Sequence, residues 1–132
     1  MMKRMLPAFL LIIVFSAFRM LDTLEGKWQY SGGIYNGKAE QPSKEYTLQR
    51  NYDAAHYSAL FLEKGQEPIA YERGDYALKN DTCLETQTYS AQPSKLLNVT
   101  IKYRYQISND TLTFSGTLPN GTVVKEYWKK VK

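Results

Sequence analysis

Apolar and polar side chains alternate strictly between residues 98 and 107. The apolar members are Val99, Ile101, Tyr103, Tyr105 and Ile107. The residues between them are Thr100, Lys102, Arg104 and Gln106. A period of two places successive side chains on opposite faces of a β-strand, so this segment predicts a strand with one buried and one wet face. We expect the odd-numbered side chains to point inward.

Turn residues on the C-terminal side of this strand predict two more strands. Ser108, Asn109 and Asp110 separate it from residues 111–118, where Leu112 and Phe114 fall on the expected core face. A Pro-Asn-Gly turn at residues 119–121 then leads into residues 122–131. Short turns of this composition join antiparallel neighbours, so the three strands form a meander.

The chain upstream of this meander has the same character. Short segments rich in Tyr, Thr, Val, Ile and Phe are separated by Gly, Asn, Asp and Pro, and no stretch has a helical apolar period. We expect strands at residues 27–35, 44–51, 56–63, 68–79 and 82–90, linked through residues 37–42, 52–55, 64–65, 80–81 and 91–97. About eight strands result.

An open sheet of about eight strands would leave two edges and one face uncovered, and the sequence supplies no helix to cover them. Closing the sheet on itself removes both problems and is favoured over a sandwich. With 132 residues there is room for one core. We therefore predict an all-β fold, a single antiparallel up-and-down β-barrel over residues 24–132.

Residues 1–19 read as a signal peptide helix ahead of the barrel. Lys3 and Arg4 give a positive start, and residues 6–18 are mostly apolar but too few for a membrane span. Cleavage after Ser16 places Val14 and Ser16 at the two small-residue positions, whereas cleavage after Ala17 would place the bulkier Phe15 upstream. An uncleaved membrane anchor is the alternative. We expect export to the periplasm or the medium. The lack of a disulfide fits a Gram-negative bacterial envelope.

Composition argues against several chemistries. A chain cleaved after the leader keeps 15 basic and 13 acidic residues, dispersed along the strands, which does not predict a nucleic-acid surface. Cys83 and His56 are the only residues of their types, so a disulfide and a multi-histidine metal site are excluded. We interpret Cys83 as a structural thiol and His56 as a turn residue. No catalytic residue, metal or cofactor is predicted.

An inward arginine is the clearest candidate for ligand binding. Tyr46, Leu48, Arg50 and Tyr52 share one strand face, which places a guanidinium among apolar and aromatic side chains. A buried arginine needs an acceptor, which is either an internal carboxylate or an anionic ligand group. The internal alternatives are Glu85 and Glu126.

Arg73 is a second inward candidate, because Ile69, Tyr71 and Arg73 also share a strand face. The opposing interpretation puts Arg50 and Arg73 on the outside of the barrel and makes the tyrosines ordinary core residues.

Two segments resemble a known family. Gly26, Lys27 and Trp28 look like the GxW signature of lipocalins, and residues 124–131 resemble the last strand of small lipocalin-like proteins exported by Gram-negative bacteria. Residues 74–82 and 110–121 resemble hairpins of the same group. The resemblance implies a calycin-type barrel in which Trp28 closes one end beneath a cation, here Lys129 or Lys130 instead of the usual arginine.

We expect such a barrel to bind a small, partly apolar or anionic ligand in its cup, and not to be an enzyme. The expected ligand-binding residues are Trp28, Tyr46, Arg50, Arg73, Tyr103, Tyr105 and Phe114. An eight-stranded barrel can also be filled by its own side chains. The alternative is therefore a filled barrel that binds or inhibits another protein through the loops at residues 37–42 and 91–97.

Overall fold

The computed structural model describes residues 23–132, so the predicted signal peptide lies outside the described residues. This part of the chain contains no helix long and apolar enough to cross a bilayer. Its strands are β1 (Gly26–Tyr35), β2 (Lys38–Glu40), β3 (Thr47–Tyr52), β4 (His56–Leu62), β5 (Ile69–Lys79), β6 (Thr82–Ser90), β7 (Thr100–Ser108), β8 (Thr111–Thr117) and β9 (Val123–Lys130).

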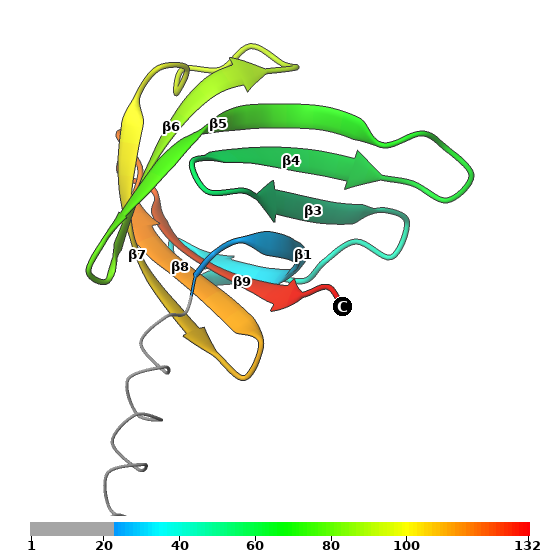
Figure 1. The fold of residues 1–132 in the computed structure, drawn as a ribbon, viewed down its shortest axis with the longest axis horizontal. Helices are drawn as coiled ribbons and strands as arrows, with labels where there is room; N and C mark the ends of the chain where they lie inside the picture. The colour runs from blue at the N-terminus through cyan, green and yellow to red at the C-terminus, as the bar shows by residue number, and fades with distance from the viewer. Residues whose placement is uncertain (1–22) are drawn as a thin grey trace, which may run out of the picture.

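The strands close into an antiparallel barrel. From β3 to β9 each strand pairs with the next along the chain, and β1 pairs with both β3 and β9 (Figure 1). The first strand (blue) therefore lies beside the last (red), and eight strands surround the interior. This confirms the all-β, closed up-and-down barrel.

The ninth strand, β2, was not predicted. It pairs with residues 33–35 of β1 across a tight turn at Asn36 and Gly37, whose φ angles are 51° and 83°. Positive φ at both central positions is typical of the hairpin turn that asparagine and glycine favour. All three residues of β2 are exposed, so the segment lacks the alternation that reveals a half-buried strand.

The alternation expected in β7 and β8 is confirmed. Tyr105 lies opposite Phe114, and Ile107 lies opposite Leu112, all on the inner face. The expected strand at residues 98–107 begins two residues later, at Thr100, because Asn98 takes a left-handed φ of 63° that interrupts the extended chain.

One end of the barrel is packed shut; we call it the sealed end. Trp28 is 1% exposed there, beside Leu24 and Leu112, which are fully buried. The Trp28 indole Nε1 donates to the Leu24 carbonyl over 2.8 Å. The Lys130 Nζ lies 4.7 Å from the Trp28 ring centroid and donates to the Glu25 carbonyl over 2.9 Å. The expected cation over Trp28 is thus Lys130, while Lys129 is exposed on the outer face.

Candidate functional site

A cavity of about 200 Å³ occupies the barrel interior toward the opposite end, which we call the open end. Its walls combine ionisable, tyrosine and aliphatic side chains contributed by most of the barrel strands and two loops. The lining residues are Tyr35, Arg50, Tyr57, Glu72, Glu85, Gln87, Leu96, Val99, Ile101, Tyr103, Leu118, Thr122, Val124 and Glu126. The barrel is therefore filled at one end only.

Arg50 points inward from β3, as expected. Its register partners are Trp28 in β1 and Ala59 in β4, both buried. Nη1 donates to both carboxylate oxygens of Glu85 at 2.9 Å, and the guanidinium carbon lies 4.8 Å from the Tyr57 ring centroid. Burial, the largest single effect, would lower the pKa of Arg50. The combined interactions with Glu85, Tyr52, Glu72 and Tyr57 outweigh it and hold that pKa well above its ordinary value.

Glu85 is the most deeply buried charged residue in the described part of the chain, at 3% exposed. Besides Arg50, it accepts a hydrogen bond of 2.6 Å from the Tyr52 hydroxyl. Burial, together with the Glu85 charge, raises the pKa of Tyr52 well above its ordinary value despite the opposing effect of Arg50. Tyr52 therefore keeps its proton and remains a donor. Of the two internal acceptors expected for Arg50, the structure uses Glu85.

Glu72 and Glu126 complete the set of interior carboxylates. Glu72 accepts a hydrogen bond of 2.5 Å from the Tyr57 hydroxyl and lies 3.5 Å from Arg50 Nη2. Glu126 accepts from the Tyr35 hydroxyl at 2.8 Å and from the Trp128 indole at 3.2 Å. Each of the three cavity carboxylates thus accepts a hydrogen bond from a neutral aromatic side chain.

Neutral donors do not balance charge. Three carboxylates and one guanidinium line the cavity, so the formal charges of its wall are unequal by two. Low-dielectric surroundings strengthen the interactions of such charges and raise the cost of leaving them uncompensated. The cavity consequently favours a positive charge within it.

The sequence did not identify Glu72 as an interior residue. A bulge in the β4–β5 pairing, between Ala59 and Leu60, and another opposite Arg73 and Gly74 break the simple alternation of β5. Glu72, Gly74 and Tyr76 therefore face inward. A side chain at Gly74 would collide with the Thr86 carbonyl and lie 2.7 Å from the Tyr57 ring, so glycine allows Tyr57 to reach Glu72.

The same change of phase makes the expected inward orientation of Arg73 wrong. Arg73 is exposed on the outer face, and its guanidinium carbon lies 5.1 Å from the Tyr89 ring centroid. Tyr46 precedes β3, is 38% exposed, and stacks on Phe61 with ring centroids 4.6 Å apart. It lies at the rim and does not line the interior cavity.

The remaining expected ligand-binding residues face inward at different depths. Tyr103 lines the cavity, and its ring centroid is 5.4 Å from that of Phe114, which is 2% exposed in the core. Tyr105 packs against the core without lining the cavity, and Trp28 belongs to the sealed end. The structure therefore brings Arg50 and Tyr103 together at the site.

Several large apolar side chains are exposed near the open end. Six large hydrophobic residues of the described chain are at least 36% exposed, and five of them belong to strand ends or loops on this side of the barrel. These five are Tyr46, Ile69, Tyr89, Leu97 and Val123. Ionisable groups and aliphatic side chains thus share the interior of the cup, and several apolar side chains are exposed near its open end.

His56 and Cys83 lie outside the cavity. His56 is exposed, and its Nδ1 lies 2.7 Å from an Asp75 carboxylate oxygen on the outer face. Cys83 is fully buried, and burial with the nearby Glu85 charge raises the pKa of its thiol well above its ordinary value. Within residues 23–132, no three His, Cys, Asp or Glu side chains are grouped closely enough to hold a metal ion.

Several solved structures share this fold. A lipocalin-like protein from Bacteroides uniformis is 21% identical, with a TM-score of 0.57 over 82% of this chain and 98% of that one. An uncharacterized protein from Bacteroides eggerthii is 16% identical, with a TM-score of 0.61 over 83% of this chain and all of the other. A redesigned β-barrel gives a TM-score of 0.53 at 17% identity, covering 83% and 92%.

The sequence matches no known family model. No curated protein is similar in sequence. At these identities the structural matches show the fold alone, and they support the expected resemblance to small lipocalin-like proteins.

Proposed function

We propose that this barrel is a non-enzymatic binding protein that holds a small, partly apolar molecule carrying one positive charge. The observation that carries the proposal is the excess of interior carboxylates: Glu72, Glu85 and Glu126 face the cavity with Arg50 alone to oppose them. An organic cation would offset this excess and would also offer apolar surface to the aliphatic residues that line the cavity.

The contacts of Arg50 favour a cation over the anionic ligand expected from the sequence. Its Nη1 already donates hydrogen bonds to both carboxylate oxygens of Glu85 and to the Tyr52 hydroxyl. An anion could compete for Arg50 only by leaving Glu85 buried and uncompensated, which is costly. A cation leaves this pair intact.

Glu126 and Tyr57 are the partners we propose for the cation. Glu126 accepts hydrogen bonds from neutral donors only. The Tyr57 ring, which already stacks near Arg50, is an aromatic surface of the kind that attracts cations. A cavity of about 200 Å³ is smaller than the roughly 300–1,000 Å³ typical of sites for drug-sized molecules, so the ligand should be compact.

Calorimetric titration with three ligands of similar shape tests the charge preference. The set is 2-phenylethylamine as the cation, 2-phenylethanol as the neutral analogue and 3-phenylpropionate as the anion. We expect the amine to bind at least tenfold more tightly than either of the others. Equal or tighter binding of the carboxylate would contradict the proposed charge while leaving a binding role standing.

Variants locate the binding site. Glu126→Gln keeps the shape of the side chain, and we expect it to weaken amine binding about tenfold. Glu67→Gln is the matched control, because Glu67 is exposed in the loop before β5. No heat with any of the three ligands, together with no small molecule retained in native mass spectrometry of the purified protein, would count against ligand binding altogether.

Export is also part of this proposal, and it depends on the sequence of residues 1–19. Expression of the full chain in a Gram-negative host tests it directly. We expect the protein in the periplasmic fraction with a new N-terminus at residue 17 or 18. A full-length chain retained in the cytoplasm would contradict it.

A further inference from the structure

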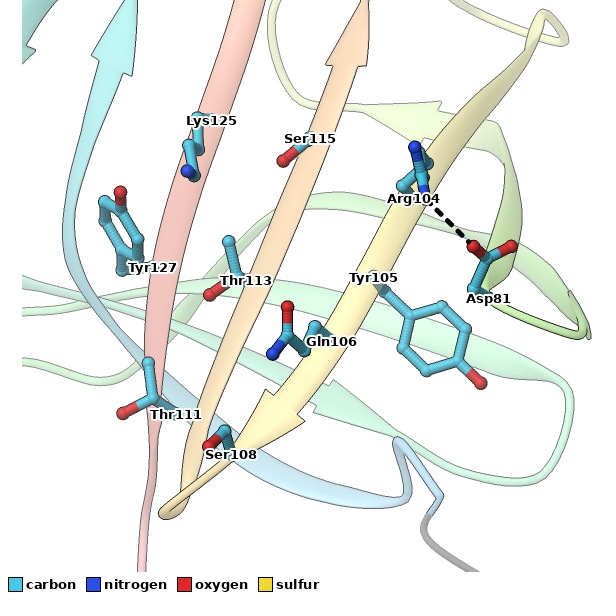
Figure 2. A pocket seen from close by; sticks show the side chains of 10 residues that line it. All are labelled: Asp81, Arg104, Tyr105, Gln106, Ser108, Thr111, Thr113, Ser115, Lys125 and Tyr127. Carbon is cyan, nitrogen blue, oxygen red and sulfur yellow. Dashed lines mark hydrogen bonds and ion pairs between the residues drawn. The ribbon is translucent and has the colours of Figure 1, made fainter. Parts of the chain in front are cut away.

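A hollow of about 620 Å³ lies outside the barrel on the outer face of β7, β8 and β9 (Figure 2). It shares no lining residue with the interior cavity. The strand residues that line it are those whose side chains alternate onto the outer face of the barrel. The Tyr105 side chain points to the other side of β7. We call this hollow the outer groove.

The strand register arranges the groove in three rows. Arg104, Ser115 and Lys125 are register partners across β7, β8 and β9 and form the first row. The second row is Gln106, Thr113 and Tyr127, and the third is Ser108, Thr111 and Lys129. Figure 2 shows Ser115 lying between Arg104 and Lys125, with Thr113 between Gln106 and Tyr127 in the next row.

These rows present repeated hydroxyl and amide groups at fixed intervals. Neighbouring strands lie about 4.8 Å apart and alternate residues of one strand about 7 Å apart, so the hydroxyls of β8 form a regular ladder. Within residues 23–132, the hydroxyls of Thr111, Thr113 and Ser115 make no hydrogen bond to another protein group. Each can donate to and accept from a bound molecule.

Cations and one aromatic ring flank the hydroxyl ladder. Lys125 is exposed, and its Nζ lies 5.9 Å from the Tyr127 ring centroid. Arg104 is exposed and forms an ion pair of 3.2 Å with Asp81. Lys129 is exposed at the end of the third row. Even with Asp81 counted, the face keeps a positive charge.

We propose that the outer groove binds an acidic oligosaccharide, a chain of sugar rings that carry sulfate or carboxylate groups. The serine, threonine and glutamine side chains supply paired donors and acceptors for sugar hydroxyls, and the half-buried Tyr127 ring supplies a flat apolar surface. Lys125 and Arg104, on either side of Ser115, hold the anionic group. This inference is independent of the interior cavity.

A pair of sugars with the same chain and different charge provides the test. Isomaltohexaose and its sulfated form are titrated against the full chain at about 0.15 M salt, with binding followed by amide NMR shifts. We expect only the sulfated sugar to bind, with shifts confined to β7, β8 and β9. Equal binding of both sugars, or shifts spread over the whole barrel, would overturn the proposal.

Two further comparisons separate sugar recognition from attraction to any polyanion. Inorganic polyphosphate of similar charge and vesicles of phosphatidylglycerol should bind at least tenfold more weakly than the sulfated sugar. If either binds as tightly, the groove is a general anionic surface and the proposal fails. Screening should weaken every exposed charge contact as salt is raised.

Substitutions identify the residues responsible. Lys125→Gln with Arg104→Gln should weaken binding of the sulfated sugar at least tenfold, and Tyr127→Ala should weaken it several-fold. Lys38→Gln and Lys64→Gln remove the same number of charges from exposed sites on β2 and in the β4–β5 loop. If this control pair reduces binding as much as the groove pair, the groove is not the site.

Discussion

The sealed end and the open end are built from the same strands and both are rich in aromatic residues, yet they are stabilised in different ways. At the sealed end Trp28, Leu24 and Leu112 exclude water by packing. Toward the open end the strands present Glu72 and Glu126 to a cavity, each held by tyrosine hydroxyls. One end gains stability from burial, and the other keeps charges that burial makes costly.

Because of this difference, we expect the two ends to contribute differently to stability and to ligand binding. Buried ion pairs can often be replaced by apolar residues with no loss of stability, so we expect the barrel to fold without the interior network. We expect changes at the sealed end to alter unfolding without altering ligand affinity. Changes in the network that leave no buried charge unpaired should alter ligand affinity with little effect on unfolding.

Removing one partner of the central ion pair should have the largest effect. Glu85→Leu leaves Arg50 buried without its main acceptor and removes the acceptor of the Tyr52 hydroxyl, which keeps only the hydrogen bond that it accepts from Arg50. We expect the free energy of unfolding, measured by urea denaturation, to fall by about 3–5 kcal/mol. The triple variant Arg50→Met, Tyr52→Phe, Glu85→Leu should recover most of that loss. A triple variant as unstable as the single one would show that the network itself holds the fold together.

Creating a cavity at the sealed end should lower the free energy of unfolding somewhat less than Glu85→Leu does. Leu112 is fully buried, and Leu112→Ala removes its side chain without removing a charge or a hydrogen bond. We expect a loss of about 2–5 kcal/mol in the same denaturation experiment. Amine affinity should stay within twofold of that of the unchanged protein, and a larger change would contradict the separation of the two ends.

Alkaline pH should destabilise the barrel through its buried tyrosines, including those of the network. Burial raises the pKa of Tyr52 and Tyr57 far above the ordinary value of 10.0, so both stay protonated when the unfolded chain has lost those protons. Their contribution to stability is complete below pH 10 and is lost as pH rises through the range above it. Each such tyrosine should lower the free energy of unfolding by about 1.4 kcal/mol per pH unit there.

Tyr103→Phe tests this dependence, because burial also raises the pKa of Tyr103. Urea unfolding measured between pH 9 and pH 11 should show a shallower decline for the variant than for the unchanged protein. The same slope in both proteins would contradict the assignment.

The smallest effect should come from the cation over Trp28. Lys130→Gln removes the charge 4.7 Å from the ring centroid, and we expect a loss of about 0.5–1 kcal/mol. Lys130→Arg should keep most of the interaction. Thermal unfolding at low and high salt would separate this contribution from simple loss of the lysine stem.

The sequence predicted the parts of the barrel in which alternation is unbroken. In β7 and β8, Tyr103, Leu112 and Phe114 face inward as expected. Prediction failed where the two-residue alternation of inward and outward side chains is interrupted. Bulges shift the phase of β5 and reverse the expected positions of Glu72 and Arg73, and no residue pattern marks those bulges in advance. The cavity itself depends on packing between distant strands, which sequence alone does not specify.

The pairing of β1 with β9 also determines when the barrel can form. These strands are neighbours in space but lie nearly a hundred residues apart, so the closing contacts have a very large sequence separation. Folds dominated by such non-local contacts fold slowly, and until β9 is available the growing sheet keeps two unpaired edges. The barrel can therefore close only after its last strand has been synthesised, and the incomplete chain is the species most prone to aggregate.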